Sequence, residues 1–425
     1  MSYSFPPVGG AGVQRVVKLA KYLPAHGVRP AVLTVRNPSV PLRDESLLAD
    51  VPIGLPVERA PTLEPGYRAK AKAWRARTSV TATVARNLLF PDPQVLWQPA
   101  AHAALLARIA AERDDVMLVS GPPFSQFLLA PLARATGLGV VLDYRDEWST
   151  LRASYEMGRS AVARMLGDPL EGALLRLAHA VVTATEEFRE NLLARFPSLD
   201  PGRVYAIPNG YDPADFPDDL PSPPSDRFVV TYAGTVFALT SAAGLLGAVG
   251  RLHETDPELA RRMLVRFVGR IVDTELPSFE GTESIGVERV GYVPHARVFH
   301  ELAASHLVLC LLDDVPGAER IYPAKVFELM HLGRPVLTLA PPASALARLA
   351  SRHALGPVLP PRDQEAIAGE LRARLRAFAC GENDRGSWQN GADLRRYDRR
   401  ALAGEFAEVL REAASCAGRG RRRGS

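Results

Sequence analysis

The sequence predicts two α/β domains, each built on a parallel, doubly wound sheet. The chain has 425 residues, more than one hydrophobic core usually supports. Short apolar or β-branched runs alternate with amphipathic helical stretches along nearly all of it, which is the pattern of βαβ units. Residues 212–226 interrupt the alternation with five prolines and five aspartates, as a linker does. We therefore expect an N-terminal domain over 1–210, a linker over 211–226, a C-terminal domain over 227–397, and a terminal helix with a basic disordered tail over 398–425.

Strands are expected on both sides of the linker. Apolar and β-branched runs predict them at 30–35, 116–119, 140–143, 180–183 and 204–207, and then at 228–233, 265–268, 307–312 and 335–339. Before the first strand, a helix is indicated by the spacing of Val13, Val16, Val17 and Ala20. A final helix over 398–414 gathers on one face Leu402, Phe406, Val409 and Leu410. That helix either caps its own domain or crosses back onto the first domain.

The composition is that of an ordinary globular protein, with 47% hydrophobic and 23% charged residues. No apolar run is long enough to cross a bilayer, and the N-terminus lacks the pattern of a secretory signal, so we expect a cytoplasmic protein. Cys310, Cys380 and Cys416 have no metal-ligand spacing, and we expect neither a metal nor a cofactor. A net charge of +4 without an aromatic-basic motif argues against a nucleic-acid partner.

Ligands of open α/β sheets gather at the carboxyl ends of the strands, and three segments there carry candidate site residues. The first is the glycine turn of Gly9, Gly10 and Gly12, which leads into the first helix. Glycines let the backbone approach an anion, and a helix start offers free N–H groups and a positive dipole end. The turn is either a phosphate cradle or a tight connection, and its spacing is not that of a dinucleotide-binding fingerprint.

The second segment, 141–148, is a strand that runs out into charged residues, which include Arg145 and Asp146. Such groups are costly to bury and suit the binding of hydroxyls or phosphates. The alternative is a surface pair of Arg145 with Asp146 above a packed Trp148.

The third segment, 319–330, contains Pro323, which suits the first turn of a helix. Lys325 and Glu328 then fall three residues apart on one face near the helix start. The cation can meet phosphate oxygens, and the carboxylate can accept both hydroxyls of a ribose. The alternative is an exposed ion pair, which stabilises a helix by about 0.2–0.5 kcal/mol.

Short motifs of one known family occur in order along nearly the whole chain. They are FPPVGGAGVQR at 5–15, FPDPQVLW at 90–97, SGPPFS at 120–125, LDYRDEW at 142–148, IPNGYD at 207–212, YAGT at 232–235, VGYV at 290–293 and YPAKVFELMHLGRPVL at 322–337. With these motifs the sequence resembles the retaining glycosyltransferases of family 4, which have the GT-B fold of two facing Rossmann-like domains. The resemblance implies transfer of a sugar, with retention, from a UDP-, GDP- or dTDP-sugar to a glycan or lipid-linked acceptor, as in the assembly of cell-surface polysaccharides and glycoconjugates.

The resemblance also implies roles for individual residues. Arg145 and Asp146 would be catalytic, because they stand where many relatives carry a His-Asp pair near the sugar. Lys325 would contact phosphate and Glu328 would hold the ribose. The full set of donor-binding residues would be Gly9, Gly10, Gly12, Gly234, Thr235, Arg270, Tyr322, Lys325 and Glu328.

Three features depart from the family pattern. Arg320 stands eight residues before Glu328, where relatives have a first glutamate, so that glutamate is either absent or displaced to Glu319. Residues 235–250 contain no basic side chain, although relatives commonly carry an arginine and a lysine there, and Arg270 is the substitute phosphate ligand that we expect. Met1 lies only four residues before Phe5, so the first strand is nearly missing.

A basic stretch at 67–77 is the candidate for the acceptor side. On a helical wheel it has an aromatic stripe flanked by basic residues, the layout of an interfacial helix on an anionic membrane. The alternative is a solvated, partly buried helix of the first domain. On the membrane interpretation the protein is peripheral on the inner face of the cell membrane, and the contacting residues are Arg68, Lys70, Lys72, Trp74 and Arg75.

Two other classes of function fit the same fold. A sugar-nucleotide epimerase would consume a sugar nucleotide without an acceptor. A non-catalytic nucleotide-sugar-binding protein would keep the ribose and phosphate contacts and lose the sugar site.

Overall fold

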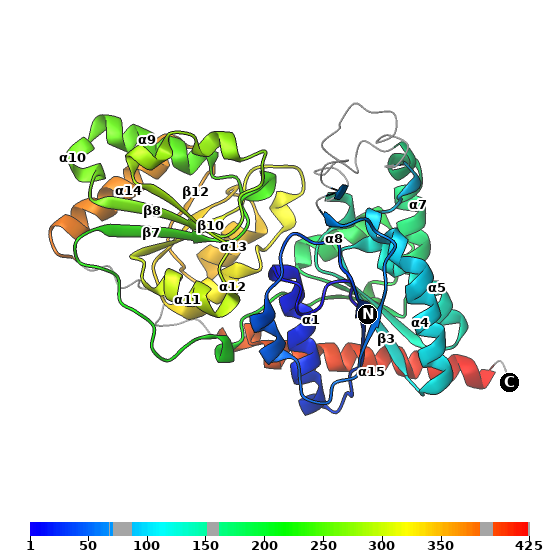
Figure 1. Cartoon of the computed structure of the whole chain (residues 1–425). Coiled ribbons are helices and arrows are strands. Elements are labelled where there is room, and N and C mark those ends of the chain that lie inside the picture. Colours follow the sequence, from blue (N-terminus) through cyan, green and yellow to red (C-terminus); the bar gives the residue numbers. More distant parts are fainter. Residues whose placement is uncertain (68, 71–86, 151–160, 383–393, 424–425) are drawn as a thin grey trace. The chain divides into compact units, whose positions relative to one another are not determined.

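A computed structural model describes residues 1–67, 69–70, 87–150, 161–382 and 394–423, and it divides the chain into two compact units (Figure 1). The N-terminal unit comprises Met1–Asn209 and Arg399–Ser425, and the C-terminal unit comprises Gly210–Asp398. The division after Asn209 lies next to the boundary expected from the sequence. The proline-rich stretch that we expected to be a linker is grouped with the C-terminal unit, where Phe216 packs on Phe299 with ring centroids 4.2 Å apart.

The strands of the N-terminal unit form two separate parallel sheets. One contains, in chain order, β3 (Val116–Gly121), β4 (Gly139–Tyr144), β5 (Ala180–Thr183) and β6 (Val204–Ala206). The other is the pair of β1 (Val32–Val35) and β2 (Val57–Ala60). The sequence predicted all of these strands except β2, whose residues VERA are mostly half-buried and lack a continuous apolar run.

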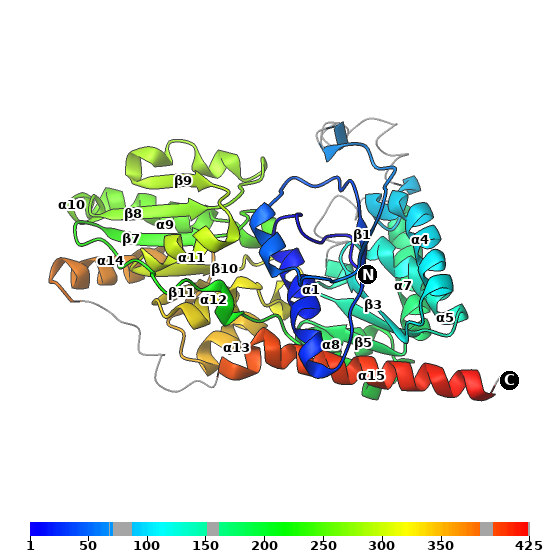
Figure 2. The ribbon, with the colours of Figure 1, turned by 60° about the horizontal axis from the view of Figure 1, so that its bottom comes forward.

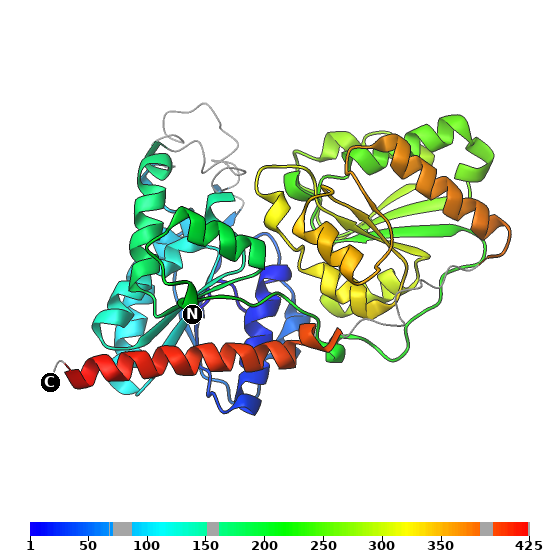
Figure 3. The same ribbon diagram turned by 180° about the vertical axis from the view of Figure 1, so that it is seen from behind.

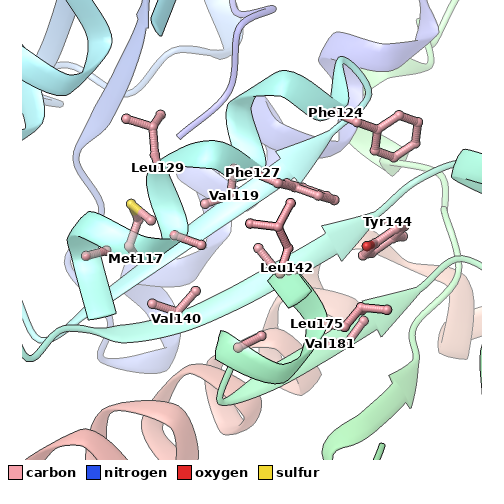
Figure 4. Packing of buried hydrophobic residues seen from close by; sticks show 14 of the residues in the cluster. Met117, Val119, Phe124, Phe127, Leu129, Val140, Leu142, Tyr144, Leu175 and Val181 are labelled. Carbon is pink, nitrogen blue, oxygen red and sulfur yellow. The ribbon is translucent and has the colours of Figure 1, made fainter. Parts of the chain in front are cut away.

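Helices cover both faces of the larger sheet in this unit (Figure 3). On one face lie α4 (Gln98–Ala111), α5 (Ala130–Ala135), α7 (Ala161–Leu177) and α8 (Glu186–Arg195), and on the other α1 (Ala11–Tyr22) and α15 (Arg399–Arg423). Figure 4 shows the first of these interfaces, where Phe127 and Leu175 pack against Val140, Leu142 and Val181. Fully buried strands of this kind explain why the sequence showed them as apolar runs.

The last helix covers the N-terminal unit, so of the two alternatives for it, crossing back is correct. Its expected apolar face packs against Val141 and Val182 of the sheet. At Gly139 the helix comes so close that an added Cβ would lie 2.9 Å from the Ala413 backbone. The tail that we expected to be disordered from residue 419 is instead helical to Arg423, because α15 runs on past its buried Ala413 and Ala417.

The C-terminal unit holds one six-stranded parallel sheet in the order β12-β11-β10-β7-β8-β9 (Figure 2). Its strands are β7 (Phe228–Ala233), β8 (Met263–Val268), β9 (Val287–Gly291), β10 (Leu307–Leu311), β11 (Val336–Leu339) and β12 (Val358–Leu359). The chain order reverses between β7 and β10, and in doubly wound sheets ligands bind at such a switch point. Two strands were not predicted from the sequence: β9, which exposes Glu288 and Arg289, and β12, which has only two residues.

Helices also cover both faces of this sheet (Figure 1). One face carries α9 (Ala243–Thr255), α10 (Pro257–Ala260) and α14 (Gln364–Ala379), and the other carries α11 (His295–Ala303), α12 (Lys325–Leu332) and α13 (Ala345–Arg352). Both units are therefore Rossmann-like, as the sequence predicted.

Candidate functional site

In the N-terminal unit, the glycine turn leaves the start of α1 open. Gly10 has a φ of 103° and is the N-cap of α1, which has no capping side chain and no acid in its first turn. A Cβ added at Gly10 would meet none of the described residues within 4 Å, so they leave space beside the turn. The free N–H groups and the positive dipole end of α1 thus form a surface on which an anion can bind.

Arg145 lies beneath this turn and is only 9% exposed. Its guanidinium donates hydrogen bonds to three backbone carbonyls, those of Gly12, Gly121 and Pro122, with the Nε bond to Gly121 measuring 3.2 Å. Arg145 therefore joins the first turn of α1 to the loop that follows β3. The alternative of a surface ion pair with Asp146 does not describe this buried side chain.

Asp146, the next residue, is half-buried, and its carboxylate makes no hydrogen bond within the described part of the chain. Burial raises the pKa of Asp146, and the nearby positive charges of Arg145 and Arg15 oppose that rise. A carboxylate of this kind, partly accessible beside two cations, can bind a hydroxyl or exchange a proton with one.

Sequence reasoning did not identify a buried ion pair that supports the turn from below. Arg15 of α1 donates to Asp143 of β4 with a shortest distance of 2.9 Å, and both side chains are almost fully buried. Asp143 also accepts from the Ser120 hydroxyl at 2.6 Å, and Arg15 donates to the carbonyls of Ile207 and Pro208 at 2.9 and 2.8 Å. These contacts fix α1 relative to three strand ends. Both residues lie within the quoted motifs, but nothing in the sequence pairs them.

In the C-terminal unit, two glycines shape the carboxyl ends of β7 and β8. Gly234 has a φ of 145°, and its N–H donates to Val268 at 2.8 Å. Gly269 has a φ of 133°, and a Cβ there would overlap the Gly234 carbonyl. Thr235 follows, and its carbonyl accepts from the Tyr232 hydroxyl at 3.0 Å. The backbone is therefore tightly folded at this edge, and neither glycine covers it with a side chain.

Lys325, the first residue of α12, reaches across this turn. Its ammonium donates to the Tyr232 hydroxyl at 2.9 Å and to the Ala233 carbonyl at 2.6 Å, and it lies 4.0 Å from the centre of the Tyr232 ring. A Cβ on Gly234 would overlap the same ammonium. Within the described residues Lys325 has no carboxylate partner, so the expected alternative of an exposed ion pair with Glu328 does not describe it.

The remaining residues of the third motif lie along the same helix start. Glu328 is half-buried one turn beyond Lys325, and Tyr322 packs edge-on against Phe327 with centroids 6.0 Å apart. We expected Pro323 in the first turn, but it precedes the Ala324 cap, where its carbonyl accepts from Val326 at 2.9 Å.

Three arginines lie near the same edge of the sheet. Arg270 follows β8, and its carbonyl accepts from the Val236 amide at 2.8 Å. Arg320 pairs with its neighbour Glu319. Arg362, which the sequence analysis did not single out, is 68% exposed and makes two 3.1 Å bonds to Asp313 after β10. Within the described residues, these side chains bring positive charge to this edge besides Lys325.

The acceptor candidates are only partly described. Arg68, Lys72, Trp74 and Arg75 lie outside the described residues. Lys70 turns into the N-terminal unit, where its ammonium lies 2.9 Å from the fully buried carboxylate of Glu64. Among the described residues, no helix is both long and apolar enough to span a membrane.

Comparisons with known proteins agree with this architecture. Residues 9–210 match the glycosyl transferase 4-like domain. A curated relative, D-inositol 3-phosphate glycosyltransferase from Stackebrandtia nassauensis, is 28% identical over 240 residues, which are 50% of this chain and 52% of that protein. The match thus spans about half the length of each.

Solved structures match over nearly the full length. Sucrose-phosphate synthase from Thermosynechococcus elongatus superposes with a TM-score of 0.65 at 15% identity, covering 95% of this chain and 93% of that one. Anabaena HepE in complex with UDP and glucose gives 0.62 at 14% identity, and WaaG, a glycosyltransferase involved in lipopolysaccharide biosynthesis, gives 0.61 at 14%. Both comparisons cover 96% of this chain and 98% of the other.

The chain thus has the GT-B fold, with two Rossmann-like domains, and it is similar to glycosyltransferases that have this fold. More particularly, residues 9–210 of its N-terminal unit are similar to the glycosyl transferase 4-like domain.

Proposed function

We propose that this protein transfers a hexose-type sugar from a nucleotide-sugar donor to an acceptor hydroxyl with retention of anomeric configuration. The observation that carries the proposal is the Lys325 ammonium. It rests on a glycine turn at the switch point of the C-terminal sheet and lacks a carboxylate partner among the described residues. A cation held by neutral acceptors keeps its charge available for a diphosphate.

On the donor side, Lys325 binds the diphosphate and stabilises it as it leaves. Glu328, one turn further along α12, holds the ribose, and Gly234 and Thr235 let the phosphates approach the backbone. Arg270 replaces the basic residues that 235–250 lack. HepE, which was solved with UDP and glucose, has the same fold and supports a uridine or related nucleotide.

On the side of the transferred sugar, we assign different roles to Arg145 and Asp146. Asp146 is the catalytic residue that contacts the sugar, because it is half-buried and its carboxylate makes no hydrogen bond among the described residues. Arg145 is a positioning residue, because its three hydrogen bonds hold the open start of α1. The cations and helix starts supply the positive charge that the leaving diphosphate needs, so activity is expected to persist in EDTA.

The acceptor is proposed to be lipid-linked or part of a surface glycan, reached by a protein that is peripheral on the inner face of the membrane. The name of one similar structure, WaaG, a glycosyltransferase involved in lipopolysaccharide biosynthesis, supports an acceptor of this kind. Three apolar side chains of the N-terminal unit, Leu63, Leu88 and Met165, are at least 69% exposed and border the undescribed segments in sequence. Co-sedimentation with liposomes of anionic and of neutral lipid tests the contact, and equal binding to both would contradict it.

A thermal-shift screen with UDP-, GDP-, dTDP- and CMP-sugars tests the donor site, since a ligand of the folded state raises the melting temperature. The donor that stabilises the wild-type chain should stabilise Lys325→Ala and Glu328→Ala much less. Arg376→Ala is the matched control, because Arg376 is exposed on α14. Equal shifts in melting temperature for all variants would show that the donor does not bind at Lys325 and Glu328.

NMR of the first product formed distinguishes the reaction classes. A product with the same anomeric configuration as the donor supports retention, and a product with the opposite configuration would contradict it. Conversion of the sugar nucleotide without an acceptor would favour an epimerase. Binding without any turnover, once acceptors have been screened, would favour a binding protein.

A further inference from the structure

The hydroxyl of Tyr232 takes part in the hydrogen bonds that hold Lys325. Tyr232 is the next-to-last residue of β7, and its side chain is fully buried. Its ring packs on Phe267 of β8 with centroids 6.1 Å apart, and the Lys325 ammonium lies 4.0 Å from the centre of the ring. The hydroxyl reaches past the end of the strand to the glycine turn, where a Cβ on Gly234 would lie 3.3 Å from its oxygen.

The direction of the hydrogen bonds at this hydroxyl is fixed. Tyr232 donates its proton to the Thr235 carbonyl at 3.0 Å, and the Thr240 hydroxyl donates to the same carbonyl at 2.7 Å. A hydroxyl has one proton and two lone pairs, so the Tyr232 oxygen can accept from the Lys325 ammonium, which lies 2.9 Å away and can only donate. The two bonds run in one direction, and each therefore polarises and strengthens the other.

The Lys325 ammonium keeps one N–H for a ligand. A lysine ammonium has three N–H donors, and here the Tyr232 hydroxyl and the Ala233 carbonyl, at 2.6 Å, accept from two of them. Within the described residues it bonds to no other acceptor. The three N–H groups are arranged tetrahedrally about the nitrogen, so two fixed acceptors also set the direction of the third. No side chain covers the ammonium at Gly234, where a Cβ would overlap it.

The same hydroxyl connects three segments of the C-terminal unit. Lys325 begins α12, and Thr235 follows β7. The amide of Val236, the next residue, donates to the Arg270 carbonyl after β8 at 2.8 Å. The Thr235 carbonyl and the Val236 amide belong to one peptide group, so an unbroken series of bonds runs from Lys325 through Tyr232 to the backbone of Arg270. A charge that is held in place before the ligand arrives costs less to order on binding.

We propose that Tyr232 is a positioning residue, whose hydroxyl directs the remaining N–H of Lys325 toward the diphosphate of the donor. Tyr232 acts through Lys325, because its own side chain is fully buried. The inference rests on the proposed function and makes a residue beneath the donor site responsible for part of its affinity. Phenylalanine in place of Tyr232 would keep the ring and its attraction for the ammonium, but it would leave the Ala233 carbonyl as the only acceptor, so that the ammonium could rotate away.

Isothermal titration calorimetry of the full chain with UDP, GDP and dTDP tests the role of Tyr232. Tyr232→Phe should weaken the binding of the preferred nucleotide about tenfold, and Lys325→Ala should weaken it roughly thirtyfold. Adding Tyr232→Phe to Lys325→Ala should cost less than about a further factor of two, because Tyr232 acts only through Lys325. Tyr397→Phe is the matched control and should bind like the wild type, since Tyr397 is buried in the same unit and its hydroxyl bonds to His353 at 3.1 Å.

The outcomes separate this role from the proposed function. Wild-type affinity in Tyr232→Phe, together with a loss in Lys325→Ala, would overturn the positioning role and leave the proposed donor site intact. The same loss from Tyr232→Phe with and without Lys325, or an equal loss in Tyr397→Phe, would assign the effect to general destabilisation of the unit and would also overturn the role. Unchanged affinity in Lys325→Ala, or a wild-type chain that binds none of the three nucleotides, would refute the donor site and the role of Tyr232 with it.

Discussion

Replacing Arg145 by lysine separates a positioning role from a direct catalytic role. The substitution keeps the positive charge, but a lysine ammonium cannot span three carbonyls as the guanidinium fork does. We expect two of the three hydrogen bonds, to the carbonyls of Gly12, Gly121 and Pro122, to be lost. The start of α1 then loses its attachment to the loop after β3.

The expected cost follows from the number of bonds and the accessibility of their acceptors. A hydrogen bond to a charged donor contributes about 1.5–3 kcal/mol, so losing two costs roughly 3–6 kcal/mol if the carbonyls stay dry. Gly12 is exposed, so water can replace one partner, which lowers the expected loss to about 2–4 kcal/mol. For a unit of this size that corresponds to a fall in melting temperature of about 5–15 °C.

Tryptophan fluorescence during urea unfolding can measure this loss in the N-terminal unit. Trp97 and Trp148 are both buried there, and Trp148 stacks on Phe124 of the loop after β3 with centroids 4.8 Å apart. Calorimetry can resolve the transitions of the two units. Arg113→Lys is the matched control, since Arg113 is exposed in the same unit, and it should unfold like the wild type.

Stability and transfer rate should fall together in Arg145→Lys, and KM for the donor should rise because the helix start is no longer held. A variant that unfolds at the wild-type urea concentration and yet transfers sugar at less than a hundredth of the wild-type rate would refute the positioning role. It would return Arg145 to the catalytic role suggested by the family resemblance.

Three further predictions concern stability. Gly269→Ala should lower the free energy of unfolding by about 1–3 kcal/mol, because φ is 133° and the new Cβ would overlap the Gly234 carbonyl. Urea titration measures this free energy, and an unchanged unfolding midpoint would contradict the prediction. Gly139→Ala should lower the free energy of unfolding by about 1–3 kcal/mol, because the new Cβ would press on the Ala413 backbone. Amide hydrogen exchange along α15 should become faster, and unchanged exchange would show that the helix does not pack against Gly139. Burial lowers the pKa of His179 to about 4, so the folded protein should keep the full contribution of neutral His179 to its stability above pH 6.5. Between pH 6.5 and pH 4 the free energy of unfolding should fall by up to about 1.4 kcal/mol per pH unit. His179→Asn should reduce this pH dependence, and an unchanged dependence would assign it to other groups.

The sequence predicted the parts of the fold whose residues are fully buried. β4 and β7 are buried at every position, and most of their residues are apolar or β-branched. β2, β9 and β12 were missed because they are short or carry charged, partly exposed side chains, so that neither alternation nor an apolar run marks them. The destination of α15 could not be read either, because an apolar helix face does not reveal which sheet it will cover.

The candidate site was predictable where its chemistry is local. Gly10 and Lys325 occupy positions defined by a turn and by a helix start, and both features lie within a few residues of the sequence. The ion pair of Arg15 with Asp143 joins residues 128 positions apart, and the Arg145 bond to Gly12 joins residues 133 positions apart. No local pattern contains such a pairing, since only the folded sheet creates it.

Arg145 and Lys325 show why residue type at a strand end does not settle a role. Both cations lie against a glycine turn at the carboxyl edge of a parallel sheet, and the family resemblance assigned both to the donor or the sugar. The Arg145 guanidinium is 9% exposed and has three backbone acceptors, so an incoming phosphate would have to displace bonds that hold the fold. The Lys325 ammonium has two neutral acceptors and no carboxylate within the described residues, so a phosphate gives it a stronger partner than it has. We therefore propose that two properties separate a cation that builds the site from one that would bind the ligand. They are the number of acceptors that the cation already has and whether any of these acceptors is charged.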